Sequence, residues 1–348
     1  MTSKKQEDYL KDIQKKLKDE RLPADLVEKA EEEVRRLQLI QQGEAFWQGL
    51  NQLSHWSDWI TALPWKEKTK DILDLDHAKT VLDESHYGLD KIKNRILEYL
   101  SVLILKEKRR EGKVRAPVLC FVGLVGTGKT TIAKSIAEAL GRKFMRIPFG
   151  GLGDPLYLRG QSRIHPEAEP GQVIKGLRQA EAKNPVILLD EIDRVADDSL
   201  NTIMGVLVEL LDPEQNDRFS DYFIDYPVDL SEAIFIATAN HTRRIATAVM
   251  DRLEVLQMPS YSDDEKIAIG KDYLLPKAIE QTGLNSNEIS FEERVWPKIT
   301  RPLGYDAGVR TLYRNIESIC RRVARQIVEG EKKQVNITVE NVNNYLPL

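Results

Sequence analysis

The chain has 348 residues, of which 41% are hydrophobic and 30% are charged, so it can bury a core and has room for two or three domains. This composition excludes disorder over the whole length. The 51 Lys and Arg residues are matched by 55 Asp and Glu residues, for a formal net charge of −4. Such a balance argues against a protein whose main task is to cover nucleic-acid phosphates, because domains of that kind are strongly basic.

Several features of the sequence predict a reducing interior compartment. Cys120 and Cys320 lie in apolar segments without the spacing of a disulfide framework or a metal site. The longest apolar stretches, such as residues 99–105, fall far short of the roughly 20 residues of a membrane helix. Residues 1–17 carry charges of both signs and contain no apolar signal segment. We therefore expect a cytoplasmic protein, or one in a comparable compartment, without a membrane partner.

Residues 1–64 are predicted to form a helical arm. Apolar residues recur at helical spacing from Leu10 to Leu17, the pattern breaks at Leu22-Pro23, and it resumes from Val27 to Leu37. One interpretation is a helical hairpin with solvated charges. An arm that packs on a neighbouring subunit would show the same pattern, so both interpretations stay open.

A cluster of four tryptophans lies at the end of this arm and the start of the next region: Trp47, Trp56, Trp59 and Trp65. Their spacing predicts helix faces that pack on apolar surface. A base-stacking platform would call for Arg or Lys between the rings. Polar uncharged residues such as Asn51, Gln52 and Ser54 occupy those places, which favours core packing.

Residues 65–259 are predicted to form an α/β domain. Short apolar runs at 118–122, 143–147, 186–189, 233–238 and 254–258 read as strands, and they alternate with helical patterns such as 130–140 and 200–211. This alternation indicates βαβ units and a mostly parallel sheet that is buried on both faces. Residues 260–348 are predicted to form a small all-helical domain, which opens with a capping box from Ser262 to Glu265.

A complete P-loop pattern lies between the predicted strand 118–122 and the helix that follows it. Backbone N–H groups of such a loop surround phosphates, and the helix N-terminus adds the positive end of its dipole. We expect Lys129 to reach the β- and γ-phosphates of ATP and the Thr130 hydroxyl to bind Mg²⁺. The predicted nucleotide-binding residues of this segment are Gly123, Gly126, Thr127, Gly128, Lys129, Thr130 and Thr131.

Two carboxylates, Asp190 and Glu191, end the apolar run 186–189. Ligands of open α/β folds bind at the carboxyl ends of the strands. Asp190 is expected to hold the metal through its water shell, and Glu191 to polarise the attacking water. The second carboxylate favours hydrolysis over nucleotide binding alone.

Three further residues are candidates for the same reaction. Asn240 ends a strand and could orient the water or contact the γ-phosphate, although Asn also ends ordinary strands. Arg252 precedes the last strand and could project into the nucleotide of a neighbouring subunit. The alternative for Arg252 is a surface arginine paired with Asp251 or Glu254. Arg310, in the small domain, could reach back to the nucleotide and couple its phosphate state to the domain angle.

The chain resembles the AAA+ ATPase module of the Lon protease family. The similarity is carried by segments 123–130, 189–193, 211–216, 235–240 and 307–310, together with Leu63-Pro-Trp65 and His86-Tyr-Gly-Leu89. It extends from about Asp8 to the C-terminus. The resemblance implies a hexameric ring that uses ATP and Mg²⁺ to pull protein substrates through a central pore into a proteolytic chamber. It also implies that Tyr87 and Gly88 line the adenine side of the nucleotide pocket.

The sequence departs from this family in two respects. A Ser–Lys protease domain would follow the small helical domain, but the sequence stops at Leu348 and holds no other nucleophile arrangement, so no peptidase activity is expected. The first pore loop of the family carries an aromatic residue and then an aliphatic one, where this chain has His165 and Pro166, with Glu167 and Glu169 close by in the sequence. The second pore region, 197–201, also lacks the basic character typical of the family.

Two main hypotheses follow. The first is an ATP-hydrolysing Lon-type motor module that unfolds, remodels or translocates proteins. The second is a nucleotide-switched regulatory or scaffold protein that threads no polypeptide, which the altered pore loop favours. A DNA-handling AAA+ protein such as a clamp loader shares the ATPase core, but the net charge of −4 and the Lon-like segments argue against it.

Overall fold

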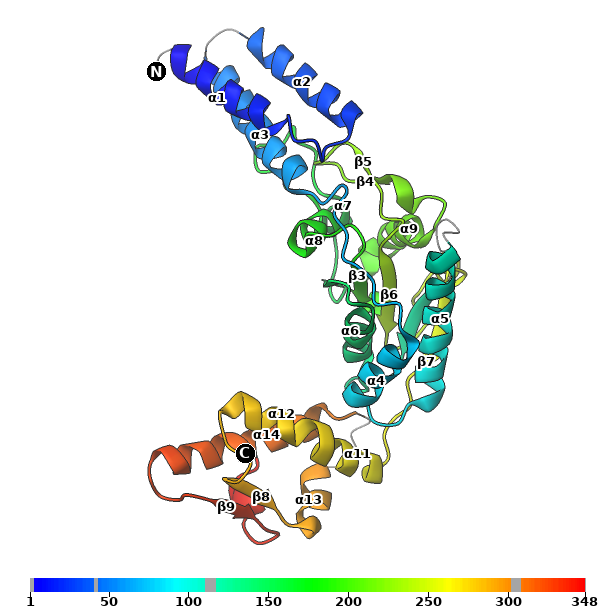
Figure 1. Ribbon diagram of the computed structural model, residues 1–348, viewed down its shortest axis with the longest axis vertical. Coiled ribbons are helices and arrows are strands. Elements are labelled where there is room, and N and C mark those ends of the chain that lie inside the picture. The colour runs from blue at the N-terminus through cyan, green and yellow to red at the C-terminus, as the bar shows by residue number, and fades with distance from the viewer. Residues whose placement is uncertain (1–2, 41–42, 110–116, 302–307, 348) are drawn as a thin grey trace. The chain divides into compact units, whose positions relative to one another are not determined.

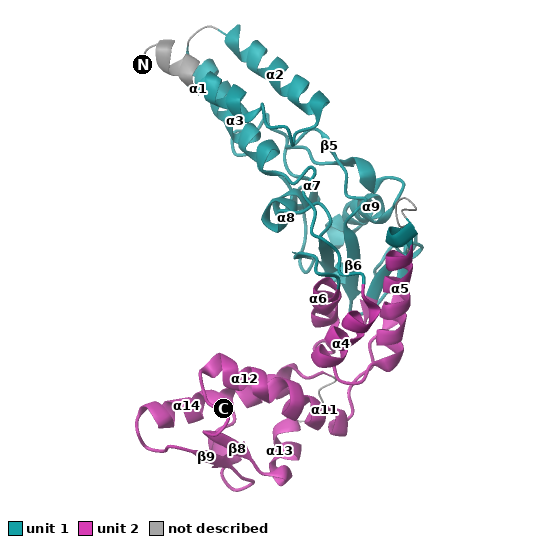
Figure 2. Cartoon of the chain, viewed as in Figure 1, with its two compact units in different colours: residues 1–73, 106–120, 140–254 teal, residues 74–105, 121–139, 255–348 magenta. Residues whose placement is uncertain are grey.

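A computed structural model describes residues 3–40, 43–109, 117–301 and 308–347 of the chain. The chain divides into two compact units, which Figure 2 distinguishes by colour. Unit 1 comprises Met1–Leu73, Lys106–Cys120 and Leu140–Glu254, and unit 2 comprises Asp74–Leu105, Phe121–Ala139 and Val255–Leu348. The three domains expected from the sequence, 1–64, 65–259 and 260–348, stay a prediction.

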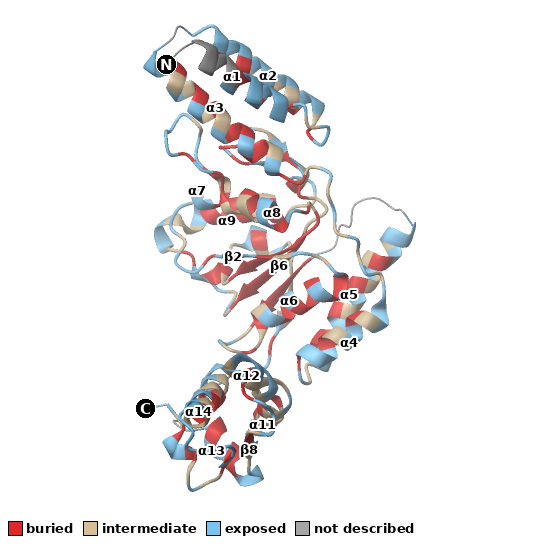
Figure 3. Ribbon diagram, turned by 60° about the vertical axis from the view of Figure 1, so that its left-hand side comes forward, coloured by how far each residue is buried: buried red, intermediate tan, exposed pale blue. Residues whose placement is uncertain are grey.

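The described residues include a five-stranded sheet with the strand order β2-β3-β6-β1-β7. Its strands are β1 (Val118–Val122), β2 (Phe144–Pro148), β3 (Val186–Asp190), β6 (Ile234–Ala239) and β7 (Leu253–Gln257). β2 and β6 each pair in parallel with β3, with Leu189 opposite Ile147 and Ala237. Every residue of β1, β3 and β6 is buried, as Figure 3 shows in red for this sheet. The α/β P-loop fold with a parallel sheet, predicted from the sequence, is confirmed.

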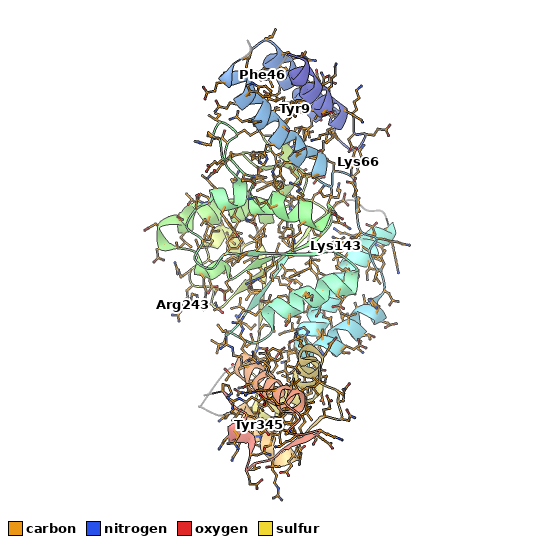
Figure 4. The ribbon with its side chains drawn as sticks, turned by 90° about the vertical axis from the view of Figure 1, so that its left-hand side faces the viewer. Tyr9, Phe46, Lys66, Lys143, Arg243 and Tyr345 are labelled. Atoms are coloured by element: carbon orange, nitrogen blue, oxygen red, sulfur yellow. The ribbon has the colours of Figure 1, made fainter. Side chains whose placement is uncertain are left out.

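Three helices of unit 1 form the N-terminal arm: α1 (Ser3–Lys16), α2 (Ala24–Gln38) and α3 (Glu44–Ala62). They lie side by side in Figure 1. On α2 the buried stripe begins at Leu26 rather than at the predicted Val27, and it continues through Ala30. At the far end of the arm, Tyr9 and Phe46 both meet the ring of Trp47 edge-on, and both are labelled in Figure 4.

Two of the four clustered tryptophans are buried, which confirms the prediction of packing for them. Trp56 and Trp59 are buried on α3. Each ring is covered by a guanidinium group, with Arg163 4.4 Å from the Trp56 ring centre and Arg178 4.3 Å from that of Trp59. These cation–π contacts attach the arm to the α/β part of unit 1. The arginines come from distant segments, so the residues between the tryptophans gave no sign of them.

The remaining elements before Ser260 are mostly helical. They are α4 (Leu75–Ser85), α5 (Asp90–Arg109), α6 (Lys129–Leu140), α7 (Leu156–Arg159), α8 (Gln172–Ala180), η1 (Ile192–Arg194), η2 (Asp197–Ser199), α9 (Leu200–Leu211), η3 (Asn216–Arg218), β4 (Phe219–Ser220), β5 (Pro227–Val228) and α10 (Thr247–Met250). Within the described residues, no helix combines the length and the apolar character that crossing a membrane requires.

The C-terminal region has its own apolar core, which includes Trp296, Ile316 and Tyr345. Its elements are α11 (Asp263–Ile269), η4 (Gly270–Leu274), α12 (Leu275–Thr282), β8 (Ile289–Phe291), η5 (Glu293–Val295), α13 (Trp296–Thr300), α14 (Arg310–Val328), β9 (Val335–Ile337) and η6 (Val342–Asn344). The predicted capping box at Ser262 is confirmed, with both of its hydrogen bonds present. The region was expected to be all helical, but it also contains the short parallel pair β8 and β9. Their contact is possible because α14 returns the chain to the same side of the core as β8.

Candidate functional site

The loop between β1 and α6 is the P-loop predicted from the sequence. Gly126 and Gly128 have φ values of +84° and +96°, a region that residues with a side chain rarely adopt. A Cβ atom on Gly123 would lie 2.7 Å from the carbonyl oxygen of Met258, so a side chain cannot be accommodated there. Glycine is therefore required at 126 and 128 by the backbone conformation, and at 123 by the close approach of the loop to Met258, just beyond β7.

Lys129 and Thr127 form the interior of this loop. The Lys129 ammonium donates to the carbonyl oxygens of Gly123 (2.7 Å) and Leu124 (3.0 Å), and the side chain is buried. The Thr127 hydroxyl donates to the Leu124 oxygen at 2.9 Å. The Thr127 carbonyl in turn accepts from the Tyr261 hydroxyl at 3.2 Å. Burial raises the pKa of Tyr261 to about 12, so its hydroxyl remains a donor at neutral pH.

The first turn of α6 carries Thr130 and Thr131. Thr130 is half-buried, and Thr131 is exposed at its surface. The Thr131 hydroxyl donates to the Gly128 carbonyl at 2.9 Å and lies 3.0 Å from Nε2 of His86. Burial, aided by the charge of Lys93, lowers the pKa of His86 to about 4, so this imidazole is neutral at pH 7. His86 therefore fixes the start of α6 from the side without adding charge.

The start of α14 contacts the P-loop directly within unit 2. The Val309 N–H donates to the Gly126 carbonyl at 3.1 Å, and a Cβ on Gly308 would lie 2.5 Å from the carbonyl carbon of Gly126. Arg310 is exposed and begins α14, with its Cγ atom close to Gly126. Ala307, part of the Lon-like segment, lies outside the described residues.

Tyr87 and Gly88, predicted to line the adenine side, follow α4. Gly88 has a φ of +60°, and Leu89 after it has a φ of +59°, so the chain turns sharply here. The Tyr87 ring meets the Tyr273 ring edge-on, with 6.4 Å between ring centres. The Tyr273 hydroxyl donates to the carbonyl of Asp83 at 3.0 Å.

Asp190 ends β3 as a buried carboxylate with a partner on each oxygen. Nε and Nη2 of Arg146 lie 2.7 Å and 2.6 Å from its Oδ2 atom. Its Oδ1 atom accepts from the Thr238 hydroxyl. Arg146 comes from β2 and Thr238 from β6, the two strands that flank β3. Neither residue was predicted to be part of the site, although Thr238 lies in the Lon-like segment 235–240.

Thr238 also holds the second acid of the pair. The Glu191 N–H donates to the Thr238 hydroxyl oxygen at 2.9 Å, and Glu191 has a left-handed φ of 59°. One hydroxyl therefore links the backbone of Glu191 to the carboxylate of Asp190. The predicted residue Asn240 is placed by its own backbone, whose N–H donates to Oδ1 of the buried Asp193 at 3.1 Å.

Arg252 forms an ion pair with Asp212, which was not among its predicted partners. Its Nη2 atom lies 2.7 Å from Oδ2 of Asp212, and its Nη1 atom donates to the Ala248 carbonyl at 2.7 Å. Asp212 lies just after α9, inside the Lon-like segment 211–216. That location was the one signal in the sequence that could have pointed to it.

The predicted pore-loop residues His165 and Pro166 are both exposed. Beside them Ile164 is 84% exposed, so the tip does present an aliphatic side chain, two positions earlier than expected. The loop is held at both ends by α3: Arg163 stacks on Trp56, and Glu169 lies 3.2 Å from His55. A cavity of about 450 Å³ lies between α3 and the loop.

The predicted site residues fall into two groups. The P-loop residues, Tyr87, Gly88 and Arg310 belong to unit 2, whereas Asp190, Glu191, Asn240 and Arg252 belong to unit 1. The residues missed were Arg146, Thr238, His86, Asp212 and Tyr261. Most act through contacts between segments distant in sequence, and only His86, Asp212 and Thr238 lay inside segments already singled out.

The residues of the chain fit a nucleotide with Mg²⁺. The positive φ values at Gly126 and Gly128 turn the P-loop backbone in the way that a phosphate-binding loop requires. The carboxylate of Asp190 and the hydroxyl of Thr130 are hard oxygen ligands of the type that Mg²⁺ prefers. Mg²⁺ commonly takes one or two protein ligands and completes its shell with phosphate oxygens and water.

Comparison with known proteins agrees with this geometry. The family described as "ATPase family associated with various cellular activities (AAA)" matches residues 119–261, and the "Lon protease AAA+ ATPase lid domain" matches residues 280–335. The chain is 44% identical over 325 residues to the Lon protease of Lawsonia intracellularis, covering 93% of this chain and 38% of the relative. It is 42% identical to that of Heliobacterium modesticaldum, covering 96% and 40%, and 43% identical to that of Dictyoglomus thermophilum, covering 97% and 42%.

The fold and the P-loop define an AAA-type ATPase module. More particularly, the chain carries the AAA+ module of the Lon protease family, as its lid match and its curated relatives show. The chain spans about two fifths of the length of those relatives.

Proposed function

We propose that the chain binds ATP with Mg²⁺ and hydrolyses it, and that this hydrolysis drives the remodelling, unfolding or translocation of protein substrates. The supporting observation is the combination of a turned P-loop at the start of α6 with an acid pair at the end of β3. β3, β6 and β1 follow one another in the sheet. Carboxyl ends of neighbouring parallel strands meet at one edge, where ligands of such folds bind.

Each proposed residue has a defined task in this reaction. The P-loop N–H groups and Lys129 hold the phosphates, and Thr130 and Asp190 hold Mg²⁺, which when bound neutralises charge on the phosphate oxygens. Glu191 orients and deprotonates the attacking water, with Asn240 as a second contact. Tyr87 and Gly88 take the adenine side, and Thr127 and Thr131 shape the loop.

Two arginines are proposed to report on the nucleotide. Arg310 lies one residue after Val309, whose N–H already bonds to the P-loop, so a change at the phosphates is transmitted directly to α14. Arg252 is proposed to act on the nucleotide of a neighbouring copy in a homo-oligomeric ring. We propose that this ring is a hexamer, and analytical sedimentation of the chain with nucleotide tests that number. The proposed setting is the cytoplasm or a comparable reducing compartment, consistent with the buried free thiols of Cys120 and Cys320.

A second candidate function is a nucleotide-switched scaffold that hydrolyses ATP without threading polypeptide. The observation that favours it is the attachment of the loop 163–169 to α3 through Trp56 and His55. A loop held at both ends has less freedom to move along a polypeptide than a loop attached only at its base.

One experiment separates the two functions. ATP hydrolysis and the loss of fluorescence of a tagged, folded substrate are measured together for the wild type, Ile164→Ser and His165→Ala, with Leu39→Ala as the control for an exposed aliphatic side chain elsewhere. If the chain is a motor, the two loop variants no longer unfold the substrate, whereas Leu39→Ala still does. All three variants should still hydrolyse ATP. If the wild type hydrolyses ATP without unfolding the substrate, and the loop variants behave in the same way, the result supports the scaffold function instead.

A further inference from the structure

The environment of Asp190 holds a positive charge where the proposed function requires a metal. The side chain of Asp190 is only 5% exposed, whereas that of its partner Arg146 is 52% exposed. A carboxylate so deeply buried is costly to leave without a counter-charge. The guanidinium of Arg146 supplies that charge, with two nitrogens directed at the single oxygen Oδ2.

The position of Arg146 on β2 explains how it reaches this carboxylate. β2 runs parallel to β3, with Arg146 opposite Leu188 and Pro148 opposite Asp190. Met145 and Ile147 alternate with Arg146 and are buried, so Arg146 lies on the solvent side of this edge strand. Its long side chain therefore spans two positions along the sheet to Asp190. Its exposed side chain can withdraw into water, and the buried residue that then loses a partner is Asp190.

Asp190 itself cannot move in the same way. Its Oδ1 atom is fixed by the Thr238 hydroxyl, which also holds the backbone of Glu191. A cation that approaches Oδ2, directly or through one of its waters, must share or take the position that Arg146 occupies. The mobile partner of this ion pair is therefore the arginine, and the fixed partner is the carboxylate.

We propose that Arg146 is an exchangeable counter-ion of Asp190, which neutralises the carboxylate in the metal-free chain and is displaced by the hydrated Mg²⁺ of the bound nucleotide. This inference rests on the proposed function. The free energy of breaking the Arg146–Asp190 ion pair then offsets part of the favourable free energy of Mg²⁺ binding at Asp190. Arg146 consequently lowers the affinity for Mg²⁺–nucleotide and stabilises the chain in its absence.

The test uses Arg146→Met, which keeps the length of the side chain and removes its charge. Arg142→Met is the matched control, because Arg142 also forms an ion pair, 2.6 Å from Asp71, away from Asp190. Binding of the slowly hydrolysed analogue ATPγS is measured by calorimetry, once with saturating Mg²⁺ and once with EDTA. Thermal unfolding is followed under the same conditions.

The expected result has three parts. Arg146→Met binds Mg²⁺–ATPγS at least about fivefold more tightly than the wild type, a gain of about 1 kcal/mol by the usual conversion. Its affinity for ATPγS in EDTA is unchanged. Its unfolding temperature without nucleotide is lower than that of the wild type. Addition of Mg²⁺–ATPγS raises the unfolding temperature of Arg146→Met by more than it raises that of the wild type. Arg142→Met also unfolds at a lower temperature but binds Mg²⁺–ATPγS as the wild type does.

Other outcomes overturn the proposal. Unchanged or weaker binding of Mg²⁺–ATPγS by Arg146→Met contradicts it. A lower affinity in EDTA would make Arg146 a phosphate ligand instead of a counter-ion. If Arg146→Met does not fold, Arg146→Lys, a weaker partner of a carboxylate, is used and must still bind Mg²⁺–ATPγS more tightly. A wild type that binds no Mg²⁺–ATPγS at all refutes the proposed function itself, which is a separate failure.

Discussion

Arg252 and Asp212 form an ion pair in which Nη2 and Oδ2 are 2.7 Å apart. The hydrogen bond from Arg252 is the main cause that lowers the pKa of Asp212 to about 2, so the carboxylate stays charged at neutral pH. The pair joins the residue before β7 to the segment after α9. An arginine proposed to serve the nucleotide of a neighbouring copy is thus oriented by a carboxylate of its own chain.

This relationship gives a prediction for Asp212→Asn. The variant should bind ATPγS as the wild type does, but its kcat should fall towards that of Arg252→Ala, because the guanidinium loses the charge that orients it. Steady-state phosphate release gives kcat, and calorimetry gives the binding constant. Arg252→Ala itself should lose nearly all hydrolysis. A normal kcat in Asp212→Asn would show that Arg252 needs no orientation by this carboxylate.

Lys129→Ala should abolish nucleotide binding. The ammonium group is the one cation inside the P-loop among the residues described there, and its removal takes away the charge that the phosphates require. Fluorescence of a labelled ATP analogue measures the affinity. Lys134→Ala, an exposed lysine on the same helix, is the control and should bind normally. Retained binding in Lys129→Ala would contradict the assignment of this loop as the phosphate site.

Thr238→Val should destabilise the chain by about 1–3 kcal/mol, because a partly buried N–H and a buried carboxylate oxygen each lose a partner. Its kcat should fall as well, since Glu191 is no longer fixed relative to Asp190. Thr238→Ser keeps the hydroxyl and should recover most of the kcat. Urea unfolding and phosphate release measure the two effects. If Ser rescues stability without kcat, the hydroxyl has a structural role only.

The neutral state of His86 predicts a specific dependence of stability on pH. The pKa of His86 is lowered from 6.5 to about 4 in the folded chain, so between these values the unfolded chain binds the additional proton. Stability from this group is complete above pH 6.5 and is lost as the pH falls towards 4. At pH 5 the loss amounts to about 2 kcal/mol by the usual conversion.

The measurement compares urea unfolding at pH 7 and pH 5 for the wild type and His86→Gln. Glutamine cannot titrate but can still bond to Thr131, so its stability should change less between the two pH values. An identical change in both proteins would mean that His86 is not the group responsible.

The sequence was sufficient to predict the fold and the P-loop because both depend on local patterns. The strand 186–189 is a continuous apolar run, and Gly126 and Gly128 are required by the positive φ values of the local backbone. The capping box at Ser262 is likewise contained within four residues. Signals of this kind are complete within one segment, so they can be recognised without a structure.

The partners of the site residues could not be predicted in the same way. Arg146 reaches Asp190 across the pairing of β2 with β3, and Thr238 reaches it from β6. Each of these contacts depends on the register of two strands, which the sequence of either strand alone does not determine. The alternative partners proposed for Arg252, Asp251 and Glu254, were chosen for nearness in sequence, whereas Asp212 is near only in space.

The central claim is that the chain hydrolyses ATP with Mg²⁺ through Glu191. The most direct measurement is steady-state phosphate release from ATP by the wild type and by Glu191→Gln, each with Mg²⁺ and with EDTA, at nucleotide concentrations shown by calorimetry to saturate both proteins. We expect release by the wild type with Mg²⁺ only, and binding without release by Glu191→Gln. Equal release by the two proteins, or none by the wild type while it is saturated with Mg²⁺–ATP, would contradict the claim.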